Sequence, residues 1–283
     1  MKTGVVDVGG GMRGIYAAGI LDYCLQQKIN FDCCIGVSAG SANLTTYQAG
    51  QRGRNLRFYT DYSFRKEYMG LSHLIRKGSY LNLPYMYGTL ANSNGEDPLD
   101  YEAFASHPAE FFVVAQEVHT GNAKYFTKAD VRKDDSRVLM ASCNIPGINR
   151  PFEVDGGLYF DGALADPVPI AKAFEEGCDK VVLILTKPVD IPRDSKQDEM
   201  IARLIRRKYP ESARNLCLRA EKYNRGVEMA KQYEKQGKVL ILSPSDTCGV
   251  TTLSRKKEAM LALYQKGVED AEQIGAFLGK EAL

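Results

Sequence analysis

The sequence lacks the features that mark several common classes of protein. No apolar run approaches the ~20 residues that a membrane-spanning helix needs. The first residues do not show the charged start, apolar stretch and cleavage site of a secretory signal. The seven cysteines include no C-x-x-C pair, and the net charge of +2 favours neither nucleic-acid binding nor an acidic tail. We therefore expect a cytoplasmic protein that binds no nucleic acid.

Histidine is also scarce, which restricts the candidates for a catalytic base. The chain has three, His73, His107 and His119, and none follows residue 119. In the usual order of an α/β-hydrolase the nucleophilic serine comes first and the histidine last. We interpret all three as surface or turn residues. A Ser-His-Asp set in another order stays open, although no motif supports it.

Short apolar runs recur along the chain, separated by longer helical patterns. They predict strands at Val5–Val8, Cys33–Val37, Phe111–Glu117, Val181–Thr186 and Val239–Leu242. The last two are almost continuously apolar, which is typical of strands buried on both faces of a parallel sheet. The alternation of strands and helices indicates a layered α/β fold with right-handed crossovers.

Two segments depart from this alternation. Residues 68–98 are rich in Tyr, Leu, Met, Gly and Asn with weak periodicity, which favours a lid-like insertion. Residues 195–238 form a basic helical segment, in which Tyr209-Pro210 predicts a break between two helices. Because an apolar strand at residues 239–243 follows, we expect the chain to return to the main sheet and residues 1–283 to form a single domain.

The first predicted strand ends in a glycine-rich loop. Gly9, Gly11 and Gly14 have the spacing G-x-G-x-x-G, which is typical of a turn that binds the pyrophosphate of a dinucleotide. That function also needs an acidic residue at the end of the second strand to bind the ribose. Asp32 precedes the second strand instead, at the opposite end of the sheet. The loop is therefore a weak candidate for a dinucleotide site.

The second predicted strand ends in a different motif. Gly36-Val37-Ser38-Ala39-Gly40 has the pattern G-x-S-x-G between a strand and a helix that we expect from Ser41 onward. At such a turn the serine adopts a strained backbone conformation, and the two glycines remove the clashes. The motif predicts that the serine is a nucleophile at the N-terminus of the next helix, whose dipole favours an anion.

The two loops follow adjacent parallel strands, so we expect them to lie side by side. In the loop Gly9–Gly14, the backbone amides of Gly10, Gly11 and Met12 are then predicted to donate hydrogen bonds to a tetrahedral oxyanion beside the serine. Arg13 is expected to add positive potential or to brace the loop.

Two carboxylates in "FEVDGGLYFDGALADPVPI" are candidates for the base that activates the serine. Asp155-Gly156 has the composition of a type I′ hairpin turn. Asp161 follows an apolar strand, where the surrounding side chains can raise its proton affinity, and we predict that it is the general base. We expect Asp166 to cap the helix that begins near Pro167.

In this order, "GGGMRG", "GVSAG" and "DGA", without a suitably placed histidine, resemble the motifs of the patatin-like phospholipases and of their bacterial members. Residues Ala141–Phe152 are similar to that family's Ala-Ser-x-x-x-Pro segment. The resemblance covers most of the chain, including the part after residue 195. Ala163 stands where the family often has a second glycine, and Cys143 and Asn144 stand where small residues are common. We expect these departures to affect the shape of the acyl pocket.

The resemblance implies a three-layer α/β sandwich with a mostly parallel central sheet, and hydrolysis of acyl esters in phospholipids or other lipids. It implies that Ser38 and Asp161 form a Ser-Asp dyad, that the loop Gly9–Gly14 is the oxyanion hole, and that neither a metal nor an organic cofactor is needed. We also expect the lid-like segment and the basic helices to offer peripheral contact with a membrane. Two alternatives stay open, namely a non-catalytic lipid-binding or interaction protein on the same scaffold and a dinucleotide-dependent oxidoreductase.

Overall fold

The computed structural model describes residues 1–279, and within them eight strands form one sheet. The strands are β1 (Thr3–Asp7), β2 (Cys33–Val37), β3 (Glu110–Glu117), β4 (Ala123–Thr127), β5 (Phe152–Val154), β6 (Gly157–Asp161), β7 (Lys180–Ile184) and β8 (Val239–Leu242). The main path of the sheet runs β5-β6-β3-β2-β1-β7-β8, and β4 pairs with β3. Strands β3, β2, β1, β7 and β8 are parallel, whereas β4, β5 and β6 run antiparallel to their neighbours. The predicted mostly parallel sheet is confirmed.

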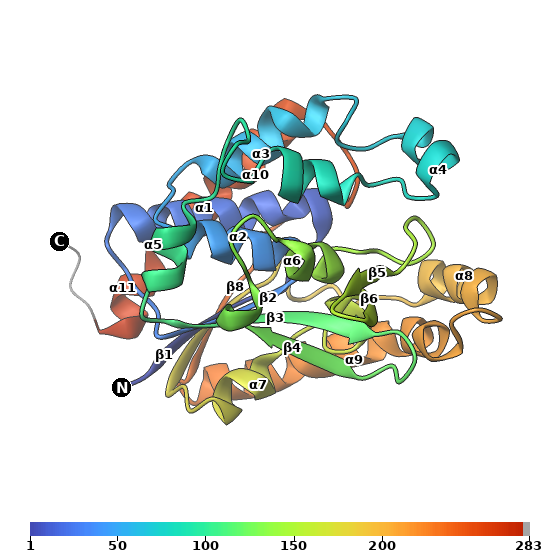
Figure 1. Cartoon of the computed structure of the whole chain (residues 1–283). Helices are drawn as coiled ribbons and strands as arrows, with labels where there is room; N and C mark the ends of the chain where they lie inside the picture. Colours follow the sequence, from blue (N-terminus) through green and yellow to red (C-terminus); the bar gives the residue numbers. More distant parts are fainter. Residues whose placement is uncertain (280–283) are drawn as a thin grey trace.

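Helices pack on both faces of this sheet, so the fold is a three-layer α/β sandwich (Figure 1). The larger layer contains α1 (Ile15–Gln26), α2 (Ala39–Gln48), α3 (Arg54–Thr60), α5 (Tyr101–Ser106), α6 (Arg137–Ser142), α10 (Lys257–Asp270) and α11 (Gln273–Leu278). The opposite layer contains α7 (Ile170–Glu175) and α9 (Pro210–Lys235). The remaining helices, α4 (Leu71–Lys77) and α8 (Lys196–Ile205), lie at the end of the molecule opposite the N-terminus.

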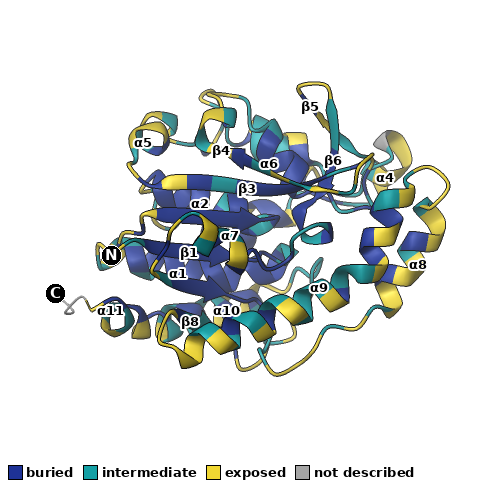
Figure 2. Ribbon diagram, turned by 90° about the horizontal axis from the view of Figure 1, so that it is seen from below, coloured by how far each residue is buried: buried dark blue, intermediate teal, exposed yellow. Residues whose placement is uncertain are grey.

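The central strands are buried on both faces. Strands β1 and β2 are buried along their whole length (Figure 2). Because successive side chains of a strand point to opposite faces, Val5 packs in the core beneath α1 and Val6 in the core against α9. The almost continuous apolar runs of the sequence therefore reflect two cores, one on each side of the sheet.

Helix α1 begins at the residue that the sequence predicts, but it is buried almost all round rather than on one face. The reason is α10, which lies directly against it. A Cβ added at Gly267 of α10 would lie 2.1 Å from the Tyr16 carbonyl oxygen of α1. The Tyr16 hydroxyl in turn donates a hydrogen bond of 2.5 Å to Asp270. Helix α10 is thus part of the same core as the first helix.

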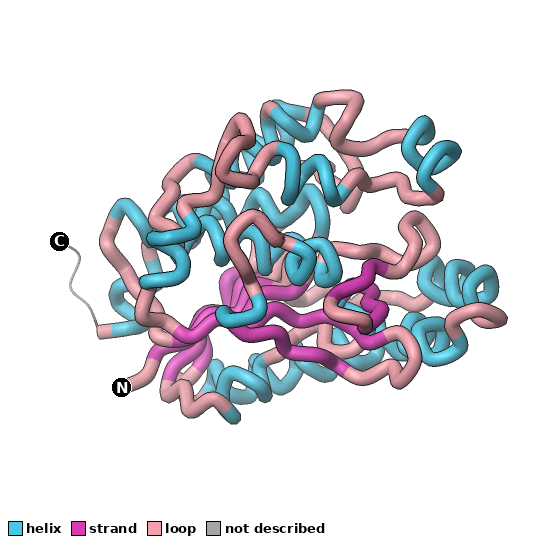
Figure 3. The backbone as a smooth tube through the Cα atoms, viewed as in Figure 1, coloured by secondary structure: helices cyan, strands magenta, loops and turns pink. Residues whose placement is uncertain are grey.

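Residues 68–98 contain little regular structure, as their weak periodicity predicts (Figure 3). They include α4 and a π-helical turn at Tyr85–Thr89. Leu83 is buried in the larger core, whereas Ile75 of α4 is 84% exposed. The segment is therefore packed core on its inner side and exposed apolar surface on its outer side.

The basic segment breaks where the sequence predicts. Helix α8 ends at Ile205 and α9 begins at Pro210. Strand β8 then pairs in parallel with β7, with Val239 opposite Val181, so the chain returns to the sheet after the basic helices. Within residues 1–279, no helix combines the length and apolar composition that crossing a bilayer requires.

The expected role of Asp166 is wrong. Helix α7 begins at Ile170, and Asp166 does not cap it. Its carboxylate instead accepts a hydrogen bond of 2.6 Å from the Tyr125 hydroxyl of β4. Pro167 and Pro169 explain the later start, because the residue before a proline is biased away from the helical conformation.

Candidate active site

Three loops that carry polar groups meet at the carboxyl edge of the sheet. Strand β1 pairs in parallel with β2 on one side and with β7 on the other. The residues that follow these strands therefore lie side by side. They are the loop Gly9–Gly14 after β1, Ser38 after β2 and Thr186 after β7. The candidate site is centred on these residues.

The turn at Ser38 is sharp and strained. Ser38 has φ 55° and ψ −132°, a conformation that costs a non-glycine residue about 1–3 kcal/mol. A Cβ added at Gly36 would lie 2.3 Å from the Cα of Ser41, and one at Gly40 would lie 2.3 Å from the Asp7 carbonyl oxygen. Both positions thus exclude any side chain. Helix α2 follows at once, beginning at residue 39 rather than at 41 as expected.

Strand β3 explains how a distant carboxylate reaches this turn. One edge of β3 pairs with β4, and the other edge pairs first with β2 and then with β6. Val37 at the end of β2 lies opposite Val114. Asp161 at the end of β6 lies opposite the next residue, Ala115. Strands β2 and β6 therefore approach each other end to end, and Ser38 and Asp161 meet where they converge.

The Asp161 carboxylate is buried, and its Oδ1 accepts a hydrogen bond of 2.9 Å from the Ala163 amide. The Ser38 hydroxyl lies close enough to lower the pKa of this carboxylate. Burial raises the pKa of Asp161, and the Ala163 amide, the Ser38 hydroxyl and the nearby charges of Arg219 and Arg193 offset part of the rise. A buried carboxylate with raised proton affinity beside a serine hydroxyl is an arrangement that suits a general base.

The chain between α6 and β5 positions both residues. The Ser142 hydroxyl accepts a hydrogen bond of 2.8 Å from the Ser38 amide and donates one of 2.6 Å to the Val114 carbonyl. The Asn144 carbonyl accepts a hydrogen bond of 2.9 Å from the Asp161 amide. The sequence indicates this segment through its family resemblance, but it does not reveal these two contacts.

The other titratable candidates lie elsewhere. Asp155 occupies the hairpin turn between β5 and β6 with φ 47°, as its composition predicts. Its carboxylate forms ion pairs with Arg132 and Arg137 at 2.9 and 3.1 Å. None of the three histidines within residues 1–279 lines a cavity that contains Ser38. These histidines are His73, His107 and His119.

The glycine loop has a backbone that requires glycine. Gly9, Gly10 and Gly11 have φ values of 65°, 134° and 61°. The Gly9 amide donates a hydrogen bond of 2.9 Å to Asp7 Oδ1, and the Gly9 carbonyl accepts one from the Thr186 hydroxyl. Two hydrogen bonds thus fix the loop, one to Asp7 at the end of β1 and one from Thr186 after β7.

The set of amides available to an oxyanion differs from the predicted one at Met12. The Met12 amide donates a hydrogen bond of 3.0 Å to the Thr252 carbonyl, in the loop after β8. Within residues 1–279, the amides of Gly10 and Gly11 donate to no acceptor, and they remain the candidate donors. The Arg13 Nη1 donates a hydrogen bond of 3.0 Å to the Thr252 hydroxyl, so Arg13 braces the loop.

Two observations weigh against a dinucleotide at this loop. Asp32 lies at the amino end of β2, where it accepts hydrogen bonds of 2.7 and 2.9 Å from the Thr3 amide and hydroxyl. A Cβ added at Gly11 would lie 2.4 Å from the Thr252 carbonyl oxygen. The backbone that approaches Gly11 closely is therefore the protein's own, at Thr252, and the glycine is needed for this contact.

An apolar cavity begins at Ser38 and extends between α2, α3 and residues 68–98. The space between its lining residues is about 850 Å³, with the open solvent at its mouth included. Burial raises the pKa of the Cys143 thiol in its wall to about 12, so this group stays neutral. The other apolar lining residues include Met12, Phe58, Tyr59, Tyr68, Met69, Leu81, Leu83, Met86, Leu139 and Ile145.

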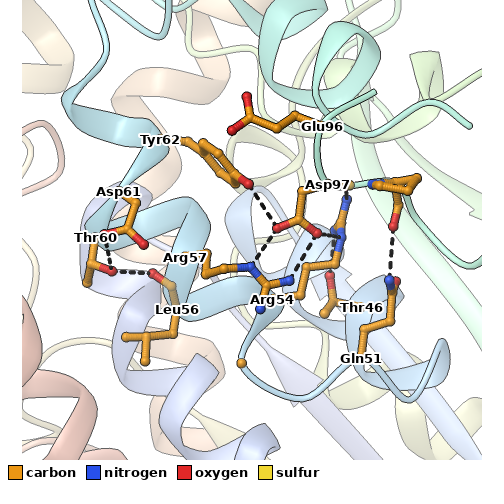
Figure 4. A network of polar contacts seen from close by, with 12 residues as sticks. Thr46, Gln51, Arg54, Leu56, Arg57, Thr60, Asp61, Tyr62, Glu96 and Asp97 are labelled. Atoms are coloured by element: carbon orange, nitrogen blue, oxygen red, sulfur yellow. Dashed lines mark hydrogen bonds and ion pairs between the residues drawn. The ribbon is translucent and has the colours of Figure 1, made fainter. Parts of the chain in front are cut away.

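A buried polar network holds the end of the 68–98 segment (Figure 4). Asp97 accepts hydrogen bonds of 2.7 and 3.0 Å from Arg57 and one of 3.2 Å from the Tyr62 hydroxyl. Arg54 donates to the Asp97 carbonyl at 2.8 Å and to the Thr46 hydroxyl at 3.0 Å. Because Arg54 and Thr46 also line the apolar cavity, the network fixes one of its walls.

Two family models match separate parts of the chain. A model described as patatin-like phospholipase matches residues 8–174, which is more than half of the chain. A model described as a domain of unknown function (DUF6363) matches residues 209–278. The first range contains the glycine loop, Ser38 and Asp161, and the second contains α9, α10 and Thr252.

Individual proteins are similar over different shares of the chain. The uncharacterized protein YjjU of Escherichia coli (strain K12) is 29% identical over 192 residues, which cover 66% of this chain and 52% of that protein. The chain thus spans about half the length of this curated relative. The crystal structure of VipD from Legionella pneumophila is 14% identical with a TM-score of 0.48, and the match covers 96% of this chain and 66% of that one.

Proposed function

The chain belongs to the patatin-like phospholipase family, and from this premise we propose that it hydrolyses carboxylic esters of phospholipids or related lipids. Ser38 is the nucleophile and Asp161 is the general base. The observation that carries the proposal is the convergence of β2 and β6, which places Ser38 beside the buried Asp161 carboxylate in one cavity. Two unengaged backbone amides, those of Gly10 and Gly11, lie in the adjacent loop.

In the acylation step, Asp161 takes the proton of the Ser38 hydroxyl as Oγ attacks the ester carbonyl carbon. The electrons of the carbonyl double bond move to its oxygen, and the amides of Gly10 and Gly11 stabilise this oxyanion. When the bond to the leaving alcohol breaks, the protonated Asp161 returns its proton to that alcohol. The products are an acyl-enzyme and a free alcohol.

In the deacylation step, Asp161 takes a proton from water, and the resulting hydroxide attacks the acyl carbon. The second tetrahedral oxyanion uses the same two amides. Its collapse breaks the bond to Ser38 Oγ, which regains a proton from Asp161. A fatty acid leaves, and both residues return to their first state.

The apolar cavity accounts for the acyl side of the substrate. It begins at Ser38 and is lined mainly by apolar side chains from three parts of the chain. An acyl chain that enters it removes apolar surface from water, which stabilises binding by roughly 0.8 kcal/mol for each CH₂ buried. The cavity thus favours an ester with a long hydrocarbon chain over a small polar ester.

The proposal is tested by labelling the protein with a fluorophosphonate, which reacts with an activated serine. We expect the wild type to be labelled and Ser38→Ala to be unlabelled. Asp161→Asn is expected to slow both labelling and ester hydrolysis by about 100-fold or more, because the general base is lost. Asp155→Asn is the matched control, since it makes the same change in an exposed turn, and it should react like the wild type.

Three results of this experiment would contradict the proposal. Equal labelling of Ser38→Ala would assign the reaction to another residue. A wild type that is neither labelled nor active on esters would favour the alternative of a non-catalytic lipid-binding protein. Loss of activity in Asp155→Asn but not in Asp161→Asn would transfer the role of base to Asp155.

We further propose that the end of the molecule that carries α4 and α8 contacts a membrane surface. Both helices lie at the end opposite the N-terminus (Figures 1 and 2). Ile75 of α4 is 84% exposed and Leu204 of α8 is 78% exposed. Arg203 and Arg206 of the α8 region are exposed as well. Exposed apolar side chains beside basic ones favour binding to a surface of anionic lipid.

A further inference from the structure

A second cavity contains Ser38 and Asp161 but differs from the apolar cavity in its chemistry. It lies between the glycine loop, the loop after β7, α8 and α9. Its charged lining residues are Arg13, Asp161, Lys187, Arg193, Asp198 and Arg219. Four of the six are cationic, so the cavity carries an excess of positive charge beside the reacting groups.

The carboxylates inside this cavity do not neutralise all of its cations. The Asp198 side chain is only 4% exposed, accepts a hydrogen bond of 2.8 Å from Arg219 Nε and forms an ion pair of 3.7 Å with Arg193. One carboxylate thus serves two guanidinium groups. Within residues 1–279, Lys187 and Arg13 form no ion pair with any carboxylate.

Arg13 lines this cavity and, within residues 1–279, has one hydrogen-bond donor without a partner. The residue is 9% exposed, and its Nη1 donates to the Thr252 hydroxyl. Its buried Nε has no hydrogen-bond partner within the described part of the chain. A buried N–H group without an acceptor is unfavourable, so the protein compensates the guanidinium group of Arg13 only in part.

The cations are close enough to affect each other. Burial lowers the pKa of Lys187, and the charges of Arg13 and Arg193 lower it further. Burial and the charge of Arg219 lower the pKa of Arg193 to about 10. An anion placed among these side chains would relieve their mutual repulsion.

The loop that carries two of these cations is held in place. Asn224 of α9 accepts a hydrogen bond of 2.8 Å from the Arg193 amide and donates one of 3.0 Å to the Arg193 carbonyl. A guanidinium group on a fixed backbone loses less conformational freedom when it binds a ligand. The cluster is thus pre-organised rather than a set of mobile surface charges.

The position of the cluster restricts the ligand to an anion that is attached to the substrate ester. The cavity contains Ser38, so an ester held there for attack extends its alcohol side toward the cations while its acyl side enters the apolar cavity. In a phospholipid, the alcohol side carries a phosphodiester, a permanent anion whose oxygens accept paired hydrogen bonds from arginine. A neutral acylglycerol has no such group.

We propose that Lys187, Arg193 and Arg219 bind the phosphate of a phospholipid substrate. The proposal rests on the proposed ester hydrolysis and narrows its substrate class to phospholipids. Lys187 and Arg193 lie outside both family-model ranges, and Arg219 lies in the range described as a domain of unknown function. The region after residue 174 thereby selects the head-group side of the substrate.

The test measures equilibrium binding to Ser38→Ala protein by titration calorimetry, so that no turnover is needed. The probes are a short-chain phosphatidylglycerol, the diacylglycerol with the same acyl chains, and inorganic phosphate. Lys187→Gln and Arg193→Gln are each added to Ser38→Ala. Arg225→Gln is the matched control, because Arg225 is an exposed arginine of α9 that pairs with Glu221.

We expect phosphatidylglycerol to bind at least about tenfold more tightly than the diacylglycerol, since charge-assisted hydrogen bonds are added. Lys187→Gln and Arg193→Gln should each remove most of this difference and leave diacylglycerol binding unchanged. Arg225→Gln should have no effect. Thermal unfolding of each variant checks that it is folded, and the two substitutions test the cluster independently.

Three results would overturn the proposal. They are equal affinity for the two lipids, an equal loss in Arg225→Gln, and binding of inorganic phosphate as tight as that of the phospholipid. The last result would indicate a site for a free anion rather than for a substrate. Because binding is measured without catalysis, failure here is distinct from failure of the labelling experiment.

Discussion

Two buried carboxylates lie at the candidate site, and burial raises the pKa of each. For Asp7 the pKa rises to about 6, although its carboxylate accepts hydrogen bonds from Asn43 and from the Gly9 amide. For Asp161 the rise is offset in part by hydrogen bonds and by the charges of Arg219 and Arg193. Both residues therefore become protonated at a higher pH than an ordinary aspartate does.

This difference leads to a prediction about the pH dependence of activity. We expect kcat/KM for a soluble ester to fall in acid with an apparent pKa above 3.8, because protonated Asp161 cannot accept the Ser38 proton. Arg193→Gln should move this acid limb to higher pH, since the charge of Arg193 favours the ionised form of Asp161. The measurement is a pH–rate profile of both proteins.

The same profile separates the two carboxylates. Arg193 is not among the groups that affect the pKa of Asp7. A shift of the limb in Arg193→Gln, absent in Arg225→Gln, would therefore assign it to Asp161. A limb that stays in place would point to Asp7 or to another group, and would weaken the proposed role of Asp161.

At the scale of elements, the contact between α1 and α10 joins the glycine loop to the C-terminal region. Helix α1 follows the loop directly, and α10 contacts it through glycines on both helices. A Cβ added at Gly19 would lie 2.2 Å from the Tyr264 carbonyl oxygen, and Gly267 makes the reciprocal contact with Tyr16. Neither backbone can move without moving the other helix.

Gly267→Ala is therefore expected to destabilise the protein by about 1–3 kcal/mol, the usual cost of overpacking a core. This cost opposes the ~1 kcal/mol that alanine gains over glycine in a helix. Chemical denaturation measures the difference. Gly88→Ala is the control, since its added methyl group would meet no atom closer than 3.8 Å. Equal stability of the two variants would show that the helices can separate freely.

At the scale of the whole molecule, the proposed membrane contact predicts binding to vesicles. In the Ser38→Ala background, we expect more protein to sediment with vesicles of phosphatidylcholine and phosphatidylglycerol than with phosphatidylcholine alone. Changing Ile75 and Leu204 together to Ser should weaken binding by about tenfold, because buried apolar surface is lost. Leu261→Ser, on exposed α10 surface, is the control. Equal loss in this control would exclude a specific contact through α4 and α8.

The parts of the site that the sequence predicts correctly are those encoded by local patterns. The strands appear as apolar runs, and the turn at Ser38 appears in five consecutive residues whose glycines have no room for a side chain. The neighbourhood of Asp161 could be inferred because its strand is short and apolar. The catalytic roles of both residues and the single-domain organisation stay predictions.

The parts that the sequence does not reveal depend on contacts between distant residues. Thr186 holds a loop 177 residues away, and Thr252 contacts Arg13 across 239 residues. A lone threonine carries no signal of such a contact. The cationic cavity is hidden for the same reason, because Arg13, Lys187 and Arg219 come from three separate elements of the fold. A distant contact can also remove a predicted role. The sequence alone predicts that the Met12 amide is free to bind an oxyanion, but this amide donates to the Thr252 carbonyl.

The pairing of β1 with β7 has a consequence for any attempt to shorten the protein. A chain cut after residue 174 would keep Ser38 and Asp161 but would lose β7 and β8. Strand β1, buried along its whole length between two neighbours, would then present a bare row of amides and carbonyls to water. Such open edges recruit other chains and lead to aggregation. The smallest piece that can fold cleanly therefore reaches well past the sequence signature of its family.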